Sequence, residues 1–415
     1  MGGGVAGISC AYQLARRGIK VTLFEARSAL GGRSRSFYDR HSGLMLDNCQ
    51  HVLLGCCYEA IDFLREIGTL DKVTFYDKLK VIDQSRRLII KSSPLPAPLH
   101  LVPALMGGDF LSASEKRALM RLAVLMPINK PTKTETAAAY FASVGCPKSL
   151  ITKLIEPVIV SALNEFPAEA SAEYARMVLL EMLFRNRRAY LLGVPDVTLS
   201  ELISEPAMRK LQEMGCELRL GTRIRALHRE NGRMRCLETG SGQRVEYDAC
   251  VAAVLPRSLA KIGIASAEQL TWRPIISAHL FYGRQIPAFE PACVVEEPFG
   301  WVFGKHPETG YVQAVASAAG GIIGLSRDEI AALAVRAAEQ VEPALAGMPL
   351  QRSIIHKERH ATFATLGCDD HRPSTVTALD NVFIAGDWVA TGWPATIESA
   401  VRSGRMAAEA IIKSG

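Results

Sequence analysis

Two hydrophobic patterns follow one another at the start of the chain. Apolar residues at positions 8, 11, 12 and 15 recur with the spacing of one helical face, and Gly18 gives this helix its C-terminal stop. The next apolar run, KVTLF, has the length of a buried strand. The pattern therefore predicts a helix over 8–17 followed by a strand over 20–24.

Similar patterns continue along the rest of the chain. They predict helices over 58–68, over most of 130–190 and over 330–341, and strands within 216–254, at 274–282 and at 311–315. Two capping boxes, Ser112 with Glu115 and Ser326 with Glu329, mark helix starts. Near the C-terminus a short apolar strand precedes a helix that Pro394 is expected to open.

A glycine-rich turn precedes the first helix. Gly2, Gly4 and Gly7 fit the pattern GxGxxG, and Glu25 follows 18 residues after Gly7. In dinucleotide-binding folds these glycines allow a tight turn, a close approach of backbone N–H groups to the pyrophosphate, and close packing of helix on strand. The helix N-terminus adds partial positive charge, and the acid accepts hydrogen bonds from the adenosine ribose. Turn, helix, strand and acid together predict a dinucleotide site.

The strand that normally leads into such a turn is missing, because only Met1 stands before the glycines. Loss of a central strand leaves the N–H and C=O groups of its neighbours unpaired. We therefore expect the natural chain to start earlier, with about six to eight more apolar residues. We also expect the 415-residue form, expressed alone, to retain its cofactor poorly or to aggregate.

Composition is that of an ordinary globular protein. The 415 residues exceed the roughly 250–300 at which single cores stop growing, so two domains are expected. The net charge of +6 is dispersed, which argues against binding of nucleic acid and leaves a solvated surface or a weak preference for anionic lipid head groups.

The 10 cysteines lie at irregular spacings, so we expect reduced thiols and no metal site. No apolar run reaches the roughly 18 residues of a membrane span, and we expect a cytoplasmic protein, peripheral at most at the inner face of the membrane.

Further motifs resemble the flavin-binding parts of the amine oxidase and phytoene desaturase superfamily. They are EAxxxxGGR at 25–33, and Gly-Asp at 386–387 followed by a proline-initiated helix. The resemblance implies an α/β fold in which a Rossmann-like FAD-binding domain, with its first strand truncated, is interwoven with an α+β substrate domain. It also implies FAD contacts, in chain order, for the turn glycines and for Glu25, Arg27, Gly32, Arg33, Ile224, Gly386, Asp387, Ala395, Thr396 and Ile397. Ile224 would meet the adenine through its backbone, or could be an ordinary core residue.

Three phrases narrow the resemblance to the hydroxysqualene dehydroxylase family. They are LDNCQH at 46–51, EP leading to SALN at 156–164, and GDW with TGWPATIE at 386–398. Cys49 departs from the glycine of the family's DNGQH phrase, and its thiol adds bulk beside the presumed flavin. The resemblance implies that an allylic alcohol, hydroxysqualene, loses its hydroxyl after protonation and accepts hydride from reduced FAD. Asp47 and His51 are the candidate proton donors, although Asp47 and Asn48 could instead only hold the loop.

The predicted elements divide the chain between the two domains in five segments. The FAD-binding domain takes 1–75, 206–265 and 373–415, and the substrate domain takes 76–205, mostly helical, and 266–372, a sheet plus a helix. The apolar stretch 94–106 contains prolines that forbid a regular helix before Val102. It suits either the entrance for an isoprenoid at a membrane surface or a buried loop. The four tryptophans could line an isoprenoid channel or fill cores.

Three alternatives stay open at this point. A carotenoid-type desaturase would share the cofactor residues and use oxidised FAD to remove hydride from a polyene. A polar amine oxidase fits less well, because Gly-Asp at 386–387 and the apolar stretch 94–106 favour an isoprenoid. A flavin-free prenyl-binding escort protein would have no use for Glu25, Arg33 and Asp387. The sequence does not indicate which electron donor reduces the flavin.

Overall fold

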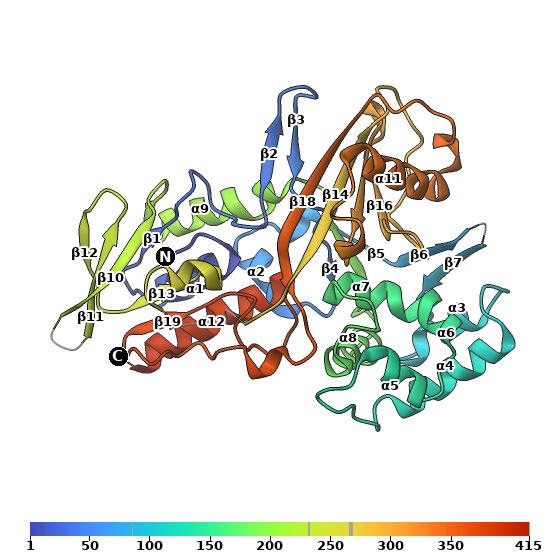
Figure 1. Cartoon of the computed structure of the whole chain (residues 1–415), viewed down its shortest axis with the longest axis horizontal. Helices are drawn as coiled ribbons and strands as arrows, with labels where there is room; N and C mark the ends of the chain where they lie inside the picture. Colours follow the sequence, from blue (N-terminus) through green and yellow to red (C-terminus); the bar gives the residue numbers. More distant parts are fainter. Residues whose placement is uncertain (85, 231–232, 265–268, 415) are drawn as a thin grey trace.

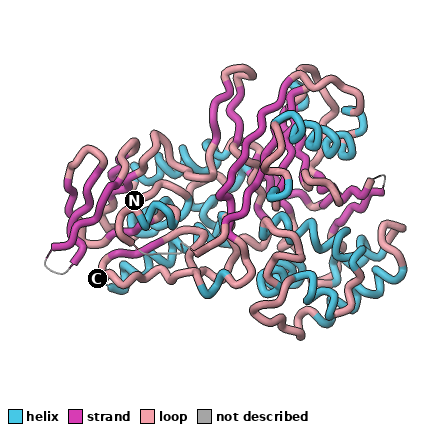
Figure 2. The backbone as a smooth tube through the Cα atoms, in the orientation of Figure 1, coloured by secondary structure: helices cyan, strands magenta, loops and turns pink. Residues whose placement is uncertain are grey.

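The computed structural model describes residues 1–84, 86–230, 233–264 and 269–414. The chain forms three regions, which Figure 1 shows side by side: a Rossmann-like region that holds both termini, a large sheet, and a helical region at the lower end of that sheet. Figure 2 shows that helices and strands are mixed in the Rossmann-like region and separated in the other two. The fold is α/β, as the sequence predicts. The five-segment domain division stays a prediction.

Two short parallel strand pairs form the centre of the Rossmann-like region. The pairs are β1 (Thr22–Phe24) with β9 (Glu217–Arg219), and β13 (Cys250–Ala252) with β19 (Val382–Ile384). Met1 lies between them: its amino group donates to Val251 O at 2.7 Å, and its carbonyl oxygen accepts from Ala253 N at 2.8 Å. On the other side, Gly2 N donates to Phe24 O at 2.7 Å. Met1 and Gly2 thus connect the two pairs.

Helices α1 (Val5–Ala15) and α12 (Ile397–Ser414) pack together beside these strands. A Cβ on Gly404 would lie 2.3 Å from the carbonyl oxygen of Ala6, so the helices approach this closely only because residue 404 is glycine. The observed bounds correct two predictions. Helix α1 begins at Val5, directly after the turn, and α12 begins at Ile397 instead of Pro394.

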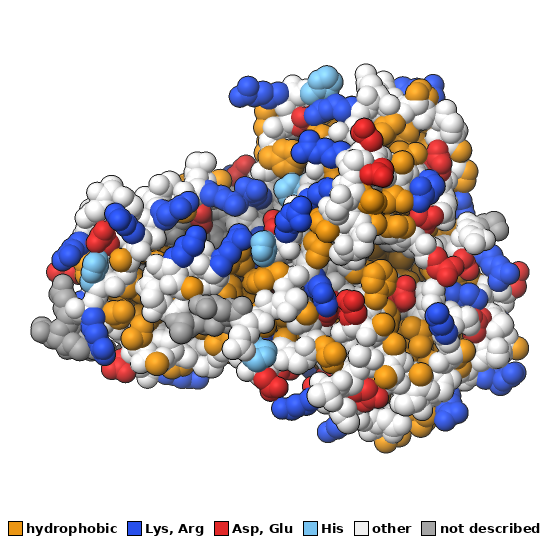
Figure 3. All heavy atoms as spheres, in the orientation of Figure 1, with side chains coloured by type: hydrophobic (Ala, Val, Ile, Leu, Met, Phe, Trp, Pro, Cys, Tyr) orange, Lys and Arg blue, Asp and Glu red, His pale blue; other side chains and the backbone are white. Residues whose placement is uncertain are grey.

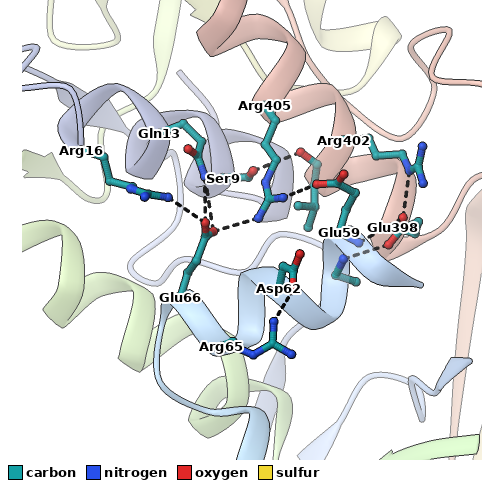
Figure 4. Close-up of polar contacts among 12 residues, drawn as sticks. Ser9, Gln13, Arg16, Glu59, Asp62, Arg65, Glu66, Glu398, Arg402 and Arg405 are labelled. Carbon is teal, nitrogen blue, oxygen red and sulfur yellow. Dashed lines mark hydrogen bonds and ion pairs between the residues drawn. The ribbon is translucent and has the colours of Figure 1, made fainter. Parts of the chain in front are cut away.

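Ion pairs fasten α2 (Tyr58–Glu66) to both helices, as Figure 4 shows. The Glu66 carboxylate accepts from Arg16, at the C-terminal end of α1, at 3.0 Å and from Arg405 of α12 at 2.9 Å. Arg405 also pairs with Glu59. These contacts join α2 to the helix that follows the glycine turn and to the helix that follows the Gly-Asp corner.

The large sheet has seven strands in the order β18-β14-β17-β16-β15-β6-β7, and only the β15–β6 pair is parallel. The strands are β18 (Arg352–Phe363), β14 (Trp272–Phe281), β17 (Tyr311–Ala316), β16 (Trp301–His306), β15 (Ala292–Val294), β6 (Lys78–Asp83) and β7 (Arg86–Lys91). Helix α11 (Arg327–Val341) covers one face with small apolar side chains. The hairpin β2 (Ser36–Asp39) and β3 (Leu44–Asp47) packs on the other face. Strands β6 and β7 belong to a segment predicted as mostly helical, so that segment also extends the sheet.

The structure confirms the helices predicted within 130–190 and both capping boxes, one in the helical region and one on helix α11 of the sheet. Ser112 and Glu115 cap α4, and Ser326 and Glu329 cap α11. The helix after the proline-rich stretch begins at Val102, as predicted. The helices here are α3 (Val102–Met106), α4 (Ala113–Leu125), α5 (Ala137–Ser143), α6 (Lys148–Leu150), α7 (Glu156–Leu163) and α8 (Ala172–Phe184). The other elements are β4 (Leu53–Leu54), β5 (Val73–Tyr76), β8 (Leu192–Pro195), α9 (Glu205–Glu213), β10 (Ile224–Glu230), β11 (Arg233–Thr239), β12 (Arg244–Glu246) and α10 (Pro256–Ala260).

Candidate active site

The glycine turn is shaped by close backbone contacts. A Cβ on Gly2, whose φ is +97°, would lie 2.2 Å from Ala253 O, and one on Gly7 would lie 1.9 Å from Gly2 O. Gly4 is different, because among the described residues a Cβ there would meet nothing nearer than Gly32 Cα, at 4.0 Å. Gly4 also precedes α1 without a side-chain cap. The first N–H groups of α1 therefore border an open cradle beside Gly32, which suits an anion.

Glu25 is held at the edge of this cradle. Its Oε2 accepts from Gly3 N at 2.7 Å, and its Oε1 accepts from Arg27 N at 2.8 Å. Thr222 N donates to the backbone oxygen of Glu25 at 2.8 Å. Ile224, the first residue of β10, follows two residues later and therefore lies near Glu25. The structure thus brings Glu25, Arg27 and Ile224 to one end of the glycine turn.

The second glycine-and-acid corner meets the first. A Cβ on Gly386 would lie 2.2 Å from Trp388 Nε1, so a side chain there would displace the indole. The buried carboxylate of Asp387 forms an ion pair with Arg33, which directly follows the cradle glycine Gly32. Arg33 also donates to Ala361 O in β18 at 2.7 Å. Residues far apart in the sequence therefore converge at Arg33.

The start of α12 lies at this same corner. Thr396 is its cap, since Thr396 Oγ1 accepts from Ser399 N at 3.3 Å and Thr396 O accepts from Ala400 N at 3.0 Å. Ser399 Oγ donates to the backbone oxygen of Asp387 at 3.0 Å. Ala395, Thr396 and Ile397 thus adjoin Asp387, as the resemblance implies, and the positive end of α12 is directed to this corner.

The loop 47–51 carries the two candidate proton donors. Buried Asp47 accepts at Oδ1 from Ser36 Oγ at 2.7 Å and from Leu199 N at 2.8 Å, and burial raises its pKa. His51 Nδ1 lies 3.1 Å from Cys49 O, and because a carbonyl only accepts, Nδ1 carries the hydrogen. Burial lowers the pKa of His51, so its ring is mainly neutral near pH 7. Asp47 therefore holds the loop and retains its proton to higher pH than an exposed aspartate.

The same loop contacts the Rossmann-like region and the sheet. Asn48 Nδ2 donates to Arg33 O at 2.7 Å. Lys305 Nζ of β16 donates to Gln50 Oε1 at 2.8 Å, and burial lowers the pKa of this ammonium group. The loop is thus a junction between the Gly-Asp corner and the sheet.

The sheet contributes polar side chains that the sequence interpretation missed. Gln313 Nε2 donates to Ser277 Oγ at 2.9 Å, while Gln313 Oε1 is buried without a hydrogen-bond partner among the described residues. His279 Nδ1 lies 2.8 Å from Tyr311 Oη, and burial lowers the pKa of His279 to about 3. The sequence carries only a weak signal for these residues. They alternate with apolar residues in ISAHLF and YVQAV, a pattern that predicts strands. It does not predict which groups pack against the polar face of those strands.

An apolar cluster, here called the inner apolar cluster, adjoins the loop. Its buried members are Leu192, Val194, Phe303 and Val315, with Cys49, Val52, Leu54, Tyr76, Leu79, Ile275 and Trp301 packed against them. Cys49 therefore fills space in an apolar wall, and burial raises the pKa of its thiol to about 12. A neutral thiol of this kind behaves as a small apolar side chain.

Comparison with known protein families identifies the chain. Residues 5–412 match the family model of the flavin-containing amine oxidoreductases. The chain belongs to this family. The hydroxysqualene dehydroxylase of Rhodopseudomonas palustris is 30% identical over 433 residues, covering 100% of this chain and 98% of that protein. The 15-cis-phytoene desaturase of Synechococcus elongatus is 22% identical over 450 residues, covering 99% of this chain and 94% of that protein.

Solved structures of the family share the fold. Cyclohexylamine oxidase from Brevibacterium oxydans superposes with a TM-score of 0.71 at 14% identity, covering 99% of this chain and 97% of that chain. Wild-type putrescine oxidase bound to putrescine gives a TM-score of 0.72 at 14% identity, covering 99% and 98%. These structures show the fold, and the family match over residues 5–412 makes the chain an FAD-dependent oxidoreductase, as the sequence motifs predict.

The described residues fit FAD. The open cradle at Gly4 and the uncapped start of α1 suit a diphosphate, and the carboxylate of Glu25 stands where ribose hydroxyls would donate. Figure 3 shows Lys and Arg side chains gathered over the Rossmann-like region near its junction with the sheet, and this positive charge also favours a diphosphate. The individual cofactor contacts stay predictions.

Proposed function

We propose that this chain reduces hydroxysqualene to squalene, with release of the hydroxyl as water. One observation carries the proposal: the loop 47–51 bonds to Arg33 at the Gly-Asp corner through Asn48, and packs on the inner apolar cluster through Cys49. This supports a site in which the candidate proton donors of the loop, Asp47 and His51, would lie between a flavin-type site and an apolar wall. The hydroxysqualene dehydroxylases that align over the whole chain support the same reaction.

The cofactor contacts follow from the two converging corners. Glu25 and Arg27 would hold the adenosine ribose, Gly4 and the start of α1 the diphosphate, and Asp387 with the start of α12 the flavin end. Bound FAD, when reduced, supplies the hydride. The start of α12 would stabilise negative charge on the ring, because a helix N-terminus is its positive end.

We assign the proton transfer to Asp47. Burial raises the pKa of its carboxyl group, which favours the protonated form, and the positive charge of Lys305 favours the carboxylate that remains after transfer. His51 is a weaker candidate, because its lowered pKa leaves little imidazolium near pH 7. The inner apolar cluster excludes water, so that an allylic cation would not be captured as the alcohol again.

The test is an anaerobic incubation of the FAD-loaded protein with hydroxysqualene and a flavin reductant, followed by chromatographic detection of squalene. Asp47→Asn keeps an oxygen for Leu199 N and removes the acid. We expect at least 100-fold slower squalene formation with unchanged flavin content. Lys305→Met should slow squalene formation by a smaller factor than Asp47→Asn does. Dehydrogenated polyene under oxidising conditions, without squalene, would instead favour a desaturase, the activity named for the 22% identical relative.

We also propose that helix α4 contacts the inner face of an anionic membrane. Met120 and Val124 on α4, and Ile128 three residues after its end, are exposed at intervals of four residues, beside the exposed Arg117 and Arg121. Leu95 and Leu99 of the proline-rich stretch are exposed as well, while His100 and Leu101 are buried. Within the described part of the chain no helix is long and apolar enough to cross a bilayer.

Vesicle sedimentation tests this contact. The protein should bind vesicles of phosphatidylglycerol more than tenfold better than vesicles of phosphatidylcholine, and binding should fall with salt. Changing Met120, Val124 and Ile128 together to serine should abolish it. Val376→Ser is the control, because Val376 is also exposed but lies in another region. Equal binding by the triple variant would refute the assignment.

A further inference from the structure

A cavity of about 310 Å³ lies where the helical region meets the sheet. Its walls come from α7 on one side and from β15, β16 and the end of β17 on the other. Apolar side chains predominate, among them Val160, Phe166, Trp301, Val315 and Ile322. Phe166, at its rim, is 46% exposed. Figure 3 shows hydrophobic side chains gathered at this junction.

Trp301 borders both the cavity and the inner apolar cluster. Its indole Nε1 donates to Ser161 Oγ of α7 at 2.8 Å, and its ring stacks on Phe303 with the centroids 6.0 Å apart. Trp301 and its strand partner Val315 line the cavity and also belong to the inner apolar cluster. Cys49 of the loop 47–51 packs on that same cluster. Packed apolar side chains are therefore continuous from the cavity, through Trp301, to the loop.

Carboxylates stand at the cavity as well. Glu156 of α7, and Glu296 and Glu297 in the turn between β15 and β16, contribute to its lining. Burial, together with the nearby Glu296, raises the pKa of Glu156. Negative charge at these positions would repel a fatty acid anion and admit a neutral chain.

We propose that this cavity is the port through which a neutral long-chain isoprenoid enters, and that Trp301, held by Ser161, closes the port. The inference rests on the proposed function for the identity of the substrate. It assigns to Trp301 the role of a positioning residue, which decides whether the apolar chain reaches the loop and does not itself take part in the chemistry.

Gly321 allows a direct test, because it lines the cavity and a Cβ there would meet no described atom within 4 Å. Gly321→Phe should fill the port without straining the backbone. Gly324→Phe is the matched control: its Cβ also has open space, and Gly324 does not line the cavity. We expect Gly321→Phe to lower kcat/KM for hydroxysqualene and the affinity for squalene at least tenfold, with flavin content unchanged. Gly324→Phe should match the wild type.

Binding of squalene is followed separately by tryptophan fluorescence. Squalene should change the emission of the wild type, and Trp301→Phe should lose that change while it still binds FAD. Palmitate should produce at most a tenth of the squalene response. If Gly321→Phe turns over hydroxysqualene and binds squalene as well as the wild type does, the proposed port is wrong. If the wild type forms no squalene but Gly321→Phe still weakens squalene binding, the proposed reaction fails and the port stands.

Discussion

At the scale of single residues, the site depends on a few polar groups whose partners are mostly backbone atoms. Glu25 is the clearest case, because each of its carboxylate oxygens accepts from a backbone N–H, of Gly3 and of Arg27. These bonds fix the carboxylate before any ligand binds, which lowers the cost of ordering it. The sequence predicted this acid from its spacing alone.

Glu25→Gln should therefore weaken FAD binding about 10- to 100-fold, since hydrogen bonds to a charged group contribute about 1.5–3 kcal/mol. The amide keeps one acceptor and loses the other. Titration of the apoprotein with FAD, followed by flavin fluorescence, measures the affinity. Glu213→Gln on the exposed end of α9 is the control and should bind FAD as the wild type does. Equal affinities in all three proteins would contradict the assigned role of Glu25.

His279 makes a prediction about pH. Its pKa falls from 6.5 to about 3 on burial, so the folded protein holds it neutral while the unfolded chain protonates it below pH 6.5. Its contribution to stability is thus present above pH 6.5 and is lost as the pH falls toward 3. Between pH 6.5 and 5 the loss is about 2 kcal/mol, at about 1.4 kcal/mol per pH unit.

Urea unfolding at the two pH values tests this. His279→Gln should remove about 2 kcal/mol from the acid-induced loss of stability, because glutamine does not titrate. An unchanged loss in the variant would show that His279 is not the group responsible.

At the scale of elements, polar groups at helix ends set the geometry of the site. Glu398 in the first turn of α12 is fully buried and accepts from Glu59 N at 3.2 Å and Ala60 N at 2.8 Å, so it caps the start of α2 (Figure 4). Arg402 donates to it at 2.8 Å. One side chain therefore positions two helices.

Glu398→Ala should lower the free energy of unfolding by about 3 kcal/mol, since two N–H groups and a guanidinium would lose a buried partner. Chemical denaturation measures this value. Glu409→Ala, at an exposed ion pair with Lys413 on the same helix, should change stability by less than about 1 kcal/mol. A loss of similar size in both variants would mean that the cap has no special importance.

Element boundaries show where sequence patterns fail. Pro394 was expected to open the last helix, because proline is favoured in a first turn. The side chain of Thr396 caps the helix instead, three residues before Ser399, and moves its start to Ile397. Capping boxes such as Ser112 with Glu115 were predicted correctly, since both partners are local in the sequence.

At the scale of the whole molecule, the site is assembled from distant segments. The glycine turn, the Gly-Asp corner and the loop 47–51 carry sequence motifs, so the sequence could predict them. Lys305, Gln313 and Trp301 carry none, because what the polar face of a strand meets depends on how the sheet packs against other regions. The sequence could therefore predict the cofactor end of the site better than its substrate end.

The central claim is that a proton donor, an apolar wall and a reduced flavin meet at the loop 47–51. A single-turnover experiment tests it most directly: protein reduced with one equivalent of reductant per flavin is mixed anaerobically with hydroxysqualene. The account predicts one squalene per flavin, formed at the rate at which the absorbance of oxidised flavin returns. Flavin that stays reduced with no squalene formed would contradict it, as would flavin oxidation without squalene.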